Sequence, residues 1–101
     1  MIEKIVKWHK ETFPDADLKS QKLKFLEEYR EYLESGDIME LADVAIVYYV
    51  LNCRFLFFKF KDIFDFETDG KWVELKKAIN KKMKINKKRK WKKEGGVYRH
   101  E

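Results

Sequence analysis

Cysteine, proline and glycine are scarce in this sequence, and each scarcity excludes a class of protein. Cys53 is the single cysteine, so a fold stabilised by intramolecular disulfides is excluded and a cytoplasmic location is expected. Its position in an apolar segment makes core packing its simplest role. One proline and 4 glycines argue against a turn-rich all-β fold and favour helices.

Long apolar segments are also missing. The amino terminus has no run of signal-peptide type, and the most apolar stretch, residues 44–58, is interrupted by Asn52 and Arg54. We therefore expect a soluble protein without a membrane anchor. No G-x-x-x-x-G-K-[ST] motif occurs, and one cysteine with two histidines provides no zinc-ligand set, which excludes a P-loop enzyme and a structural zinc site.

The net charge of +5 is unevenly distributed. Residues 1–70 carry 10 Lys+Arg and 15 Asp+Glu, whereas residues 71–101 carry 13 and 3. The acidic part suits cations, and the basic part suits polyanions, either nucleic acid or the phosphates of a smaller ligand. By length the chain is a single domain, residues 1–101, with a basic tail over about residues 87–101.

Hydrophobic periodicity and end signals predict an all-α, four-helix bundle-like fold. The first helix ends at Phe13-Pro14, because the residue before proline avoids the helical conformation. Ser35-Gly36 ends the second helix, and Asp37 caps the third with Glu40 completing a capping box. A strand remains an alternative for the β-branched third segment, but its length without glycine or proline favours a helix. The predicted ranges are 2–13, 18–35, 37 to about 58 or 60, and 72 to about 91.

The remaining segments are predicted to be connections, with Asp69-Gly70 as a turn in a loop over residues 61–70 and an irregular tail over residues 97–101. One face of the second helix is expected to bury Phe25, Leu26, Tyr29, Tyr32 and Leu33. The phenylalanines of the third segment and the loop give more apolar surface than one unit can bury, which predicts a homodimer or homotetramer. They are Phe55, Phe57, Phe58, Phe60, Phe64 and Phe66.

Two pairs of carboxylates stand out, each with helical spacing. Glu28 and Glu31 share one side of the second helix, and Glu40 and Asp43 share one side of the third. Because the connection between these helices is short, they should pack antiparallel and bring the four carboxylates together. Glu27, one turn before Glu31, adds a fifth, which either supports the others or acts as a general base.

Asp43 is the most informative of these residues, because it lies inside the apolar stretch LADVAIVYYVL, where an unpaired charge is costly to bury. A positively charged group is therefore expected beside the Asp43 carboxylate. Converging oxygen ligands suit Mg²⁺ or Mn²⁺, and Mg²⁺ commonly links carboxylates to substrate phosphates, so a nucleotide polyphosphate is the expected ligand. The alternative is a solvated acidic face with a Lys24–Glu28 ion pair and Glu40 as a cap residue. The doubled pattern favours the metal site.

The two-part acidic motif resembles the signature of the MazG-like, all-α nucleoside triphosphate pyrophosphohydrolases. KLKFLEEYREYLE and ELADVAIV are similar to the family's sequences around both acidic pairs. KKMKINKKRKW, with the residues that follow it up to His100, is similar to the end of small phage and bacterial members of dATP/dGTP type. The resemblance covers most of the chain from Trp8. The segment between Glu31 and Glu40 is shorter than in many relatives, so a second subunit is expected to complete the pocket.

The resemblance implies Mg²⁺-dependent hydrolysis of a (deoxy)nucleoside triphosphate to monophosphate and pyrophosphate, in nucleotide-pool cleaning. The site residues that it implies are Glu28, Glu31, Glu40 and Asp43 for the metal, Lys82 and Arg89 for phosphate, and Asn86 for the nucleoside. The last three lie at i, i+4 and i+7, one stripe of the fourth helix. Glu27 or Glu31 would accept the proton of the attacking water.

Other interpretations remain open at this stage. Trp8 and Trp91 are candidates to stack on a base, and core packing explains either equally well. A nucleic-acid-binding helical module without catalysis would use the basic segment, but it does not explain Asp43. A structural helical oligomer with an aromatic interface is a third interpretation.

Overall fold

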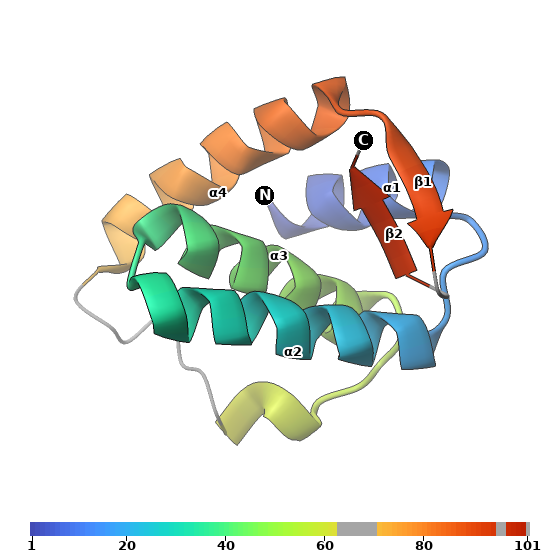
Figure 1. Ribbon diagram of the computed structural model, residues 1–101, viewed down its shortest axis with the longest axis horizontal. Coiled ribbons are helices and arrows are strands. Elements are labelled where there is room, and N and C mark those ends of the chain that lie inside the picture. The colour runs from blue at the N-terminus through green and yellow to red at the C-terminus, as the bar shows by residue number, and fades with distance from the viewer. Residues whose placement is uncertain (63–70, 95–96, 101) are drawn as a thin grey trace.

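The computed structural model describes residues 1–62, 71–94 and 97–100. Its four α-helices are α1 (Ile2–Thr12), α2 (Leu18–Ser35), α3 (Ile38–Cys53) and α4 (Trp72–Lys88) (Figure 1). A 3-10 helix, η1 (Lys59–Asp62), and an antiparallel hairpin of β1 (Trp91–Glu94) and β2 (Val97–His100) complete the described elements. The predicted all-α, bundle-like fold is confirmed.

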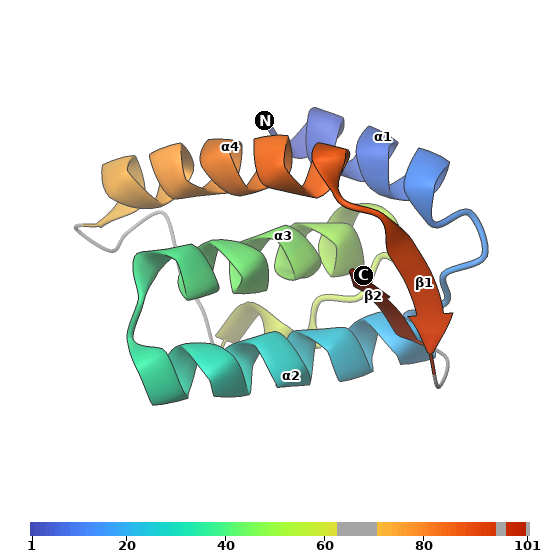
Figure 2. The same ribbon diagram turned by 45° about the horizontal axis from the view of Figure 1, so that its top comes forward.

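Helix α3 lies at the centre of this arrangement. Helix α2 packs antiparallel to it on one side, α4 covers another side, and α1 also packs on it (Figure 2). Residues 41–51 of α3 are buried except Asp43, which is partly buried. The helix has no solvent face, and this explains why its sequence is apolar without a polar stripe. Each fully buried core side chain, such as Phe25 of α2, contributes roughly 1.5–3 kcal/mol to stability.

The ends of α2 agree with the predicted range and have clear physical causes. At its start, Ser20 N–H donates to the Asp17 carboxylate at 2.7 Å and Asp17 N–H donates to Ser20 Oγ at 3.2 Å, which forms a capping box. At its end, Gly36 adopts φ 68° and its N–H donates to Tyr32 C=O at 2.7 Å. This sharp stop lets α3 fold back at once along α2.

Helix α3 differs from its predicted form at both ends. Asp37 caps it by accepting from Met39 N–H at 2.9 Å, but Asp37 N–H donates to Ser35 Oγ, so the expected box with Glu40 is not formed. The helix ends at Cys53, before the predicted residues 58–60, and Leu56 turns the chain with φ 54°. Cys53 is exposed, so its expected role in the core is wrong.

The carboxyl end also corrects a prediction. Helix α4 ends at Lys88, before the predicted Trp91, and the tail expected to be irregular pairs with β1 so that Trp91 faces His100 and Glu94 faces Val97. The hairpin lies beside the start of α2 (Figure 1). The predicted Asp69-Gly70 turn lies outside the described residues.

The surface differs from expectation as well. Leu26 and Leu33 are 52% and 63% exposed, so the predicted apolar face of α2 is only partly buried. Phe57 and Phe60 instead pack on the core, and Phe60 stacks on Phe25 with ring centroids 4.4 Å apart. Phe64 and Phe66 lie outside the described residues. Among the described helices, none combines the length and apolarity needed to cross a membrane.

Candidate functional site

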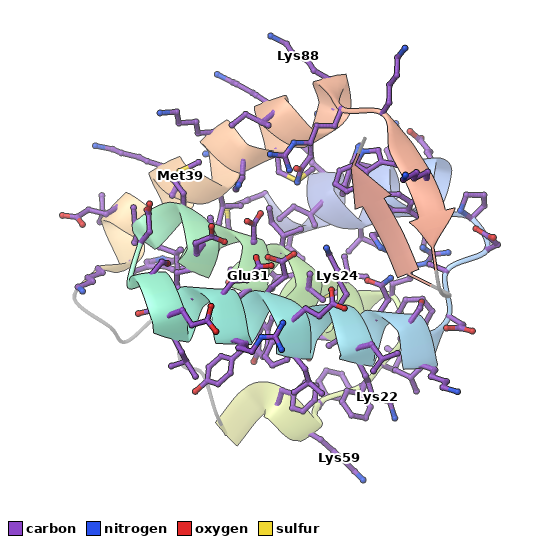
Figure 3. The ribbon with its side chains drawn as sticks, in the orientation of Figure 1. Lys22, Lys24, Glu31, Met39, Lys59 and Lys88 are labelled. Carbon is purple, nitrogen blue, oxygen red and sulfur yellow. The ribbon has the colours of Figure 1, made fainter. Side chains whose placement is uncertain are left out.

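Carboxylates from α2 and α3 meet on the facing sides of these two helices. Carboxylate oxygens of Glu28, Glu40 and Asp43 all lie within 4.8 Å of one another, close enough for one cation to contact all three. Figure 3 shows Glu31 on the side of α2 that faces α3, and it hydrogen-bonds to Glu28. The four predicted ligands are therefore brought together, with Glu31 next to the group of three.

Two lysines neutralise part of this charge. Lys82 of α4 lies 3.1 Å from Asp43, and Lys24 of α2 lies 2.9 Å from Glu28. Lys82 is the positive partner that the position of Asp43 predicts. The Lys24–Glu28 pair of the solvated-face alternative is also present, but the same Glu28 is buried and belongs to the carboxylate cluster. Four carboxyl groups face two ammonium groups, so the site has more acidic groups than lysines to pair with them.

Two of the acids hold their protons more tightly than usual, because they are removed from water and lie beside other acids. Burial first, and then the charge of Glu28, raises the pKa of Asp43 to about 7 against the opposing effect of Lys82. Partial desolvation, followed by Glu28 and the hydrogen bond to it, raises the pKa of Glu31 above its ordinary value. Both carboxyls would gain from a nearby cation.

A cleft of about 380 Å³ opens onto the carboxylates, and α4 forms its basic wall. Lys82, Asn86 and Arg89 all line it, but Arg89 lies just beyond the end of α4 in extended backbone and not on a helical stripe. Asn86 is only 5% exposed, yet its amide makes no hydrogen bond to any described residue. Every described side-chain nitrogen or oxygen that is fully buried has a hydrogen-bond partner, so an amide without a partner is not fully buried. Because Asn86 lines the cleft, its amide is reachable from there.

The other end of the cleft is aromatic. Trp8, Phe13 and Trp91 line it, with centroids 5.4 Å apart for Trp8–Phe13 and 5.2 Å apart for Phe13–Trp91, and each pair meets edge to face. The indole N–H of Trp91 donates to Asn86 C=O at 3.2 Å, which fixes its ring. Trp91 lines the cleft of its own chain, so this chain needs no neighbour to supply it.

Sequence reasoning and the structure differ over several residues. Glu27 is not among the residues that line the cleft, so the structure does not bring it to the other carboxylates. Gln21 and His9 line the cleft but were not predicted as site residues. The signal that could have found His9 is its place on the apolar stripe of α1.

Comparisons of this chain with models of protein families, with curated proteins and with solved structures found no match. The sequence resemblance stays a prediction, and a functional proposal depends on the cleft itself.

Proposed function

We propose that this chain is a Mg²⁺-dependent nucleoside triphosphate pyrophosphohydrolase, which converts a (deoxy)nucleoside triphosphate and water to the monophosphate and pyrophosphate. The observation that carries the proposal is the order of chemistry along one cleft. Lys82 of α4 pairs with Asp43 at the carboxylates, and one turn further along α4 the backbone C=O of Asn86 accepts from Trp91. Trp91 packs against Phe13, so carboxylates, a cationic side chain and aromatic rings follow one another along the cleft wall. A nucleotide presents its metal-bound phosphates and its planar base in the same order.

The carboxylates divide into two roles in this proposal. Glu28, Glu40 and Asp43 fit a hard divalent cation, Mg²⁺ or Mn²⁺, because all their ligand atoms are oxygens and their spacing is short. When bound, such a cation neutralises phosphate charge and lowers the pKa of a bound water. Glu31 is the candidate general base, because its raised pKa brings it closer to the working pH. Attack of water on the α-phosphorus breaks its bond to the bridging oxygen, and pyrophosphate leaves.

Lys82 connects the carboxylates to the phosphates. It pairs with Asp43 at 3.1 Å, and a cation at the cluster would satisfy Asp43 in its place. The ammonium group would then be released toward the triphosphate beside Arg89, which can hold two phosphate oxygens through its planar fork. Substrate and cation would therefore bind best together.

The test is a panel of ribo- and deoxyribonucleoside triphosphates assayed with Mg²⁺ in water enriched in oxygen-18. We expect monophosphate and pyrophosphate as products, with the heavy oxygen in the monophosphate, because the attacked phosphorus retains the water oxygen. Diphosphate and phosphate as products would contradict the proposed reaction. No turnover across the panel, together with salt-sensitive binding to nucleic acid, would favour the basic binding module instead.

A further inference from the structure

Two buried polar side chains at the aromatic end of the cleft have no part in the hydrolysis described above. His9 of α1 is 5% exposed and Gln21 of α2 is 6% exposed, and both line the cleft, where the His9 ring lies against Trp8 and Phe13. Buried polar groups need hydrogen-bond partners, and the direction of each bond is set by which atoms can donate. The partners of His9 therefore determine what this end of the cleft offers a ligand.

Arg54 determines the state of the His9 ring. Its Nη1 lies 2.7 Å from His9 Nδ1, and its other bonds to the end of α1, at 2.9 Å to Phe13 C=O and 3.2 Å to Pro14 C=O, hold the guanidinium in place. A guanidinium only donates hydrogen bonds, so Nδ1 must accept, and the single ring hydrogen lies on Nε2. Burial, with the charge of Arg54 second, lowers the pKa of His9 to about 3, so the ring is neutral at physiological pH.

Gln21 continues this chain of hydrogen bonds. His9 hydrogen-bonds to the Gln21 side chain, and since its free ring nitrogen is a donor, Gln21 accepts through its amide oxygen. The amide NH₂ group of Gln21 has no acceptor among the described residues. Every described side-chain nitrogen that is fully buried has a partner, so this group is not fully buried. It is reachable from the cleft, which Gln21 lines. The order Arg54 to His9 to Gln21 ends in an amide donor on a residue that lines the cleft.

We propose that Gln21 reads the edge of the nucleobase through this donor, and that the site therefore prefers 6-oxo over 6-amino purines and 4-oxo over 4-amino pyrimidines. Arg54 and His9 are positioning residues, because they hold the Gln21 amide in one of its two orientations. A carbonyl oxygen on the base accepts from Gln21, whereas an exocyclic amino group would set two donors against each other. The proposal depends on the proposed nucleotide function and names the class of base.

Binding of matched nucleotides tests this without depending on turnover. We expect inosine monophosphate to bind the full chain at least about tenfold more tightly than adenosine monophosphate in calorimetry, and uridine monophosphate more tightly than cytidine monophosphate, in ribo or deoxy form. Hydrolysis rates of the matching triphosphates should follow the same order. Equal affinities within both pairs would overturn the base preference and leave the proposed hydrolysis standing. If none of the four nucleotides binds, the base preference and the proposed function both fall.

Variants separate recognition from general effects on the fold. Gln21→Glu presents only acceptors to the base and should reduce or reverse the oxo preference, whereas Lys22→Gln, outside the cleft and above the Phe57 ring, should leave it unchanged. Arg54→Met should bring the ratio of affinities close to one, and Arg54→Lys, which keeps a donor, should retain more of it. Long-range ¹H–¹⁵N spectra provide a direct check, since a hydrogen on His9 Nδ1 would overturn the proposed direction of the chain. An unchanged ratio in Gln21→Glu would do the same.

Discussion

The substitution Asp43→Asn distinguishes a metal site from a purely structural ion pair between Asp43 and Lys82. If the pair is structural, Asp43→Asn leaves a partly buried lysine without a counter-charge and should cost up to about 3–5 kcal/mol of stability. If Asp43 is a metal ligand, its charge is a burden on the metal-free fold, as its pKa of about 7 indicates. The Asn variant should then be as stable as the parent or more stable when no metal is present.

We predict the second outcome together with a loss of hydrolysis by roughly 100-fold or more, the order of magnitude that misplacing a reacting group costs. Urea unfolding with a chelator gives the stability, and pyrophosphate release with Mg²⁺ gives the activity. Glu40→Gln should behave alike, because its carboxylate belongs to the same cluster. Full activity in either variant would remove the metal-site proposal.

His9 provides a pH-dependent contribution to stability with a defined sign. In the unfolded chain it takes up a proton near pH 6.5, whereas burial first, and Arg54 second, lower its pKa in the folded protein to about 3. Between these values the unfolded state binds more protons, so the free energy of unfolding rises with pH. The contribution is complete above about pH 6.5 and is lost as the pH falls toward 3. The full shift corresponds to about 5 kcal/mol, which is the upper bound of the contribution.

The titration of Asp43 must be removed from this measurement. Its raised pKa makes the free energy of unfolding fall with pH between about pH 4 and 7, opposite to the effect of His9. We therefore compare Asp43→Asn with the double variant that adds His9→Asn, whose amide oxygen can still accept from Arg54. The stability difference between the two should shrink as the pH falls from 6.5 to 3, measured by urea unfolding without metal. A difference that is constant with pH would show that His9 titrates normally in the folded protein.

Helix α4 presents two different basic faces, and the proposal assigns a role to only one. Arg89 lines the cleft, whereas Lys88, its neighbour in sequence, is exposed and extends away from the protein (Figure 3). Arg89→Ala should raise KM for the triphosphate about tenfold, since it removes a charged phosphate contact. Lys88→Ala is the matched control and should change KM little. Equal small effects in steady-state kinetics would support a solvated basic face without a ligand role.

The helices that are defined by local signals could be predicted from the sequence. Helix α2 has the predicted range, because its capping residues and Gly36 act within a few residues of the chain. The end of α3 could not be predicted in this way. The chain turns at Leu56, which adopts the left-handed conformation usually taken by glycine, and Phe57 N–H donates back to Leu51 C=O. Phe60 then stacks on Phe25 of α2. The hairpin had a usable signal, since Gly95-Gly96 separates two short runs of strand type.

The candidate site was predictable to a similar degree. Helical spacing was sufficient to bring Glu28 and Asp43 together, because both helices are straight neighbours joined by one tight turn. Gln21, His9 and Arg54 follow no shared sequence period and come from three segments of the chain. Their meeting depends on how α1 packs on α3, which no local pattern specifies. Glu27 was predicted as a site residue but does not line the cleft. It is next to Glu28 in sequence, and consecutive residues of a helix point in different directions.

At the scale of the whole molecule, the cleft contains residues of α1, α2, α3, α4 and β1 from one chain. The second subunit expected to complete the pocket is therefore not needed for any of the described groups. The homo-oligomer stays a prediction, but the surface through which the copies would meet differs from the phenylalanine-rich surface expected from the sequence. Phe57 and Phe60 pack on the chain's own core, whereas Leu23, Leu26 and Leu33 are exposed along the outer face of α2.

We predict that two copies pair antiparallel through this outer face of α2. Leu23 and Leu33 lie equally far along α2 from the midpoint of the stripe, so each would meet the other across a two-fold axis. The double variant Leu26→Glu/Leu33→Glu should be monomeric in analytical ultracentrifugation, with unchanged helix content by circular dichroism. It should retain hydrolysis, because the cleft is built within one chain. Val73→Glu, an exposed apolar position on α4, is the control and should not alter association. A parent protein that is monomeric at assay concentrations would contradict the pairing, and an inactive monomeric variant would show that the neighbouring copy contributes to the site after all.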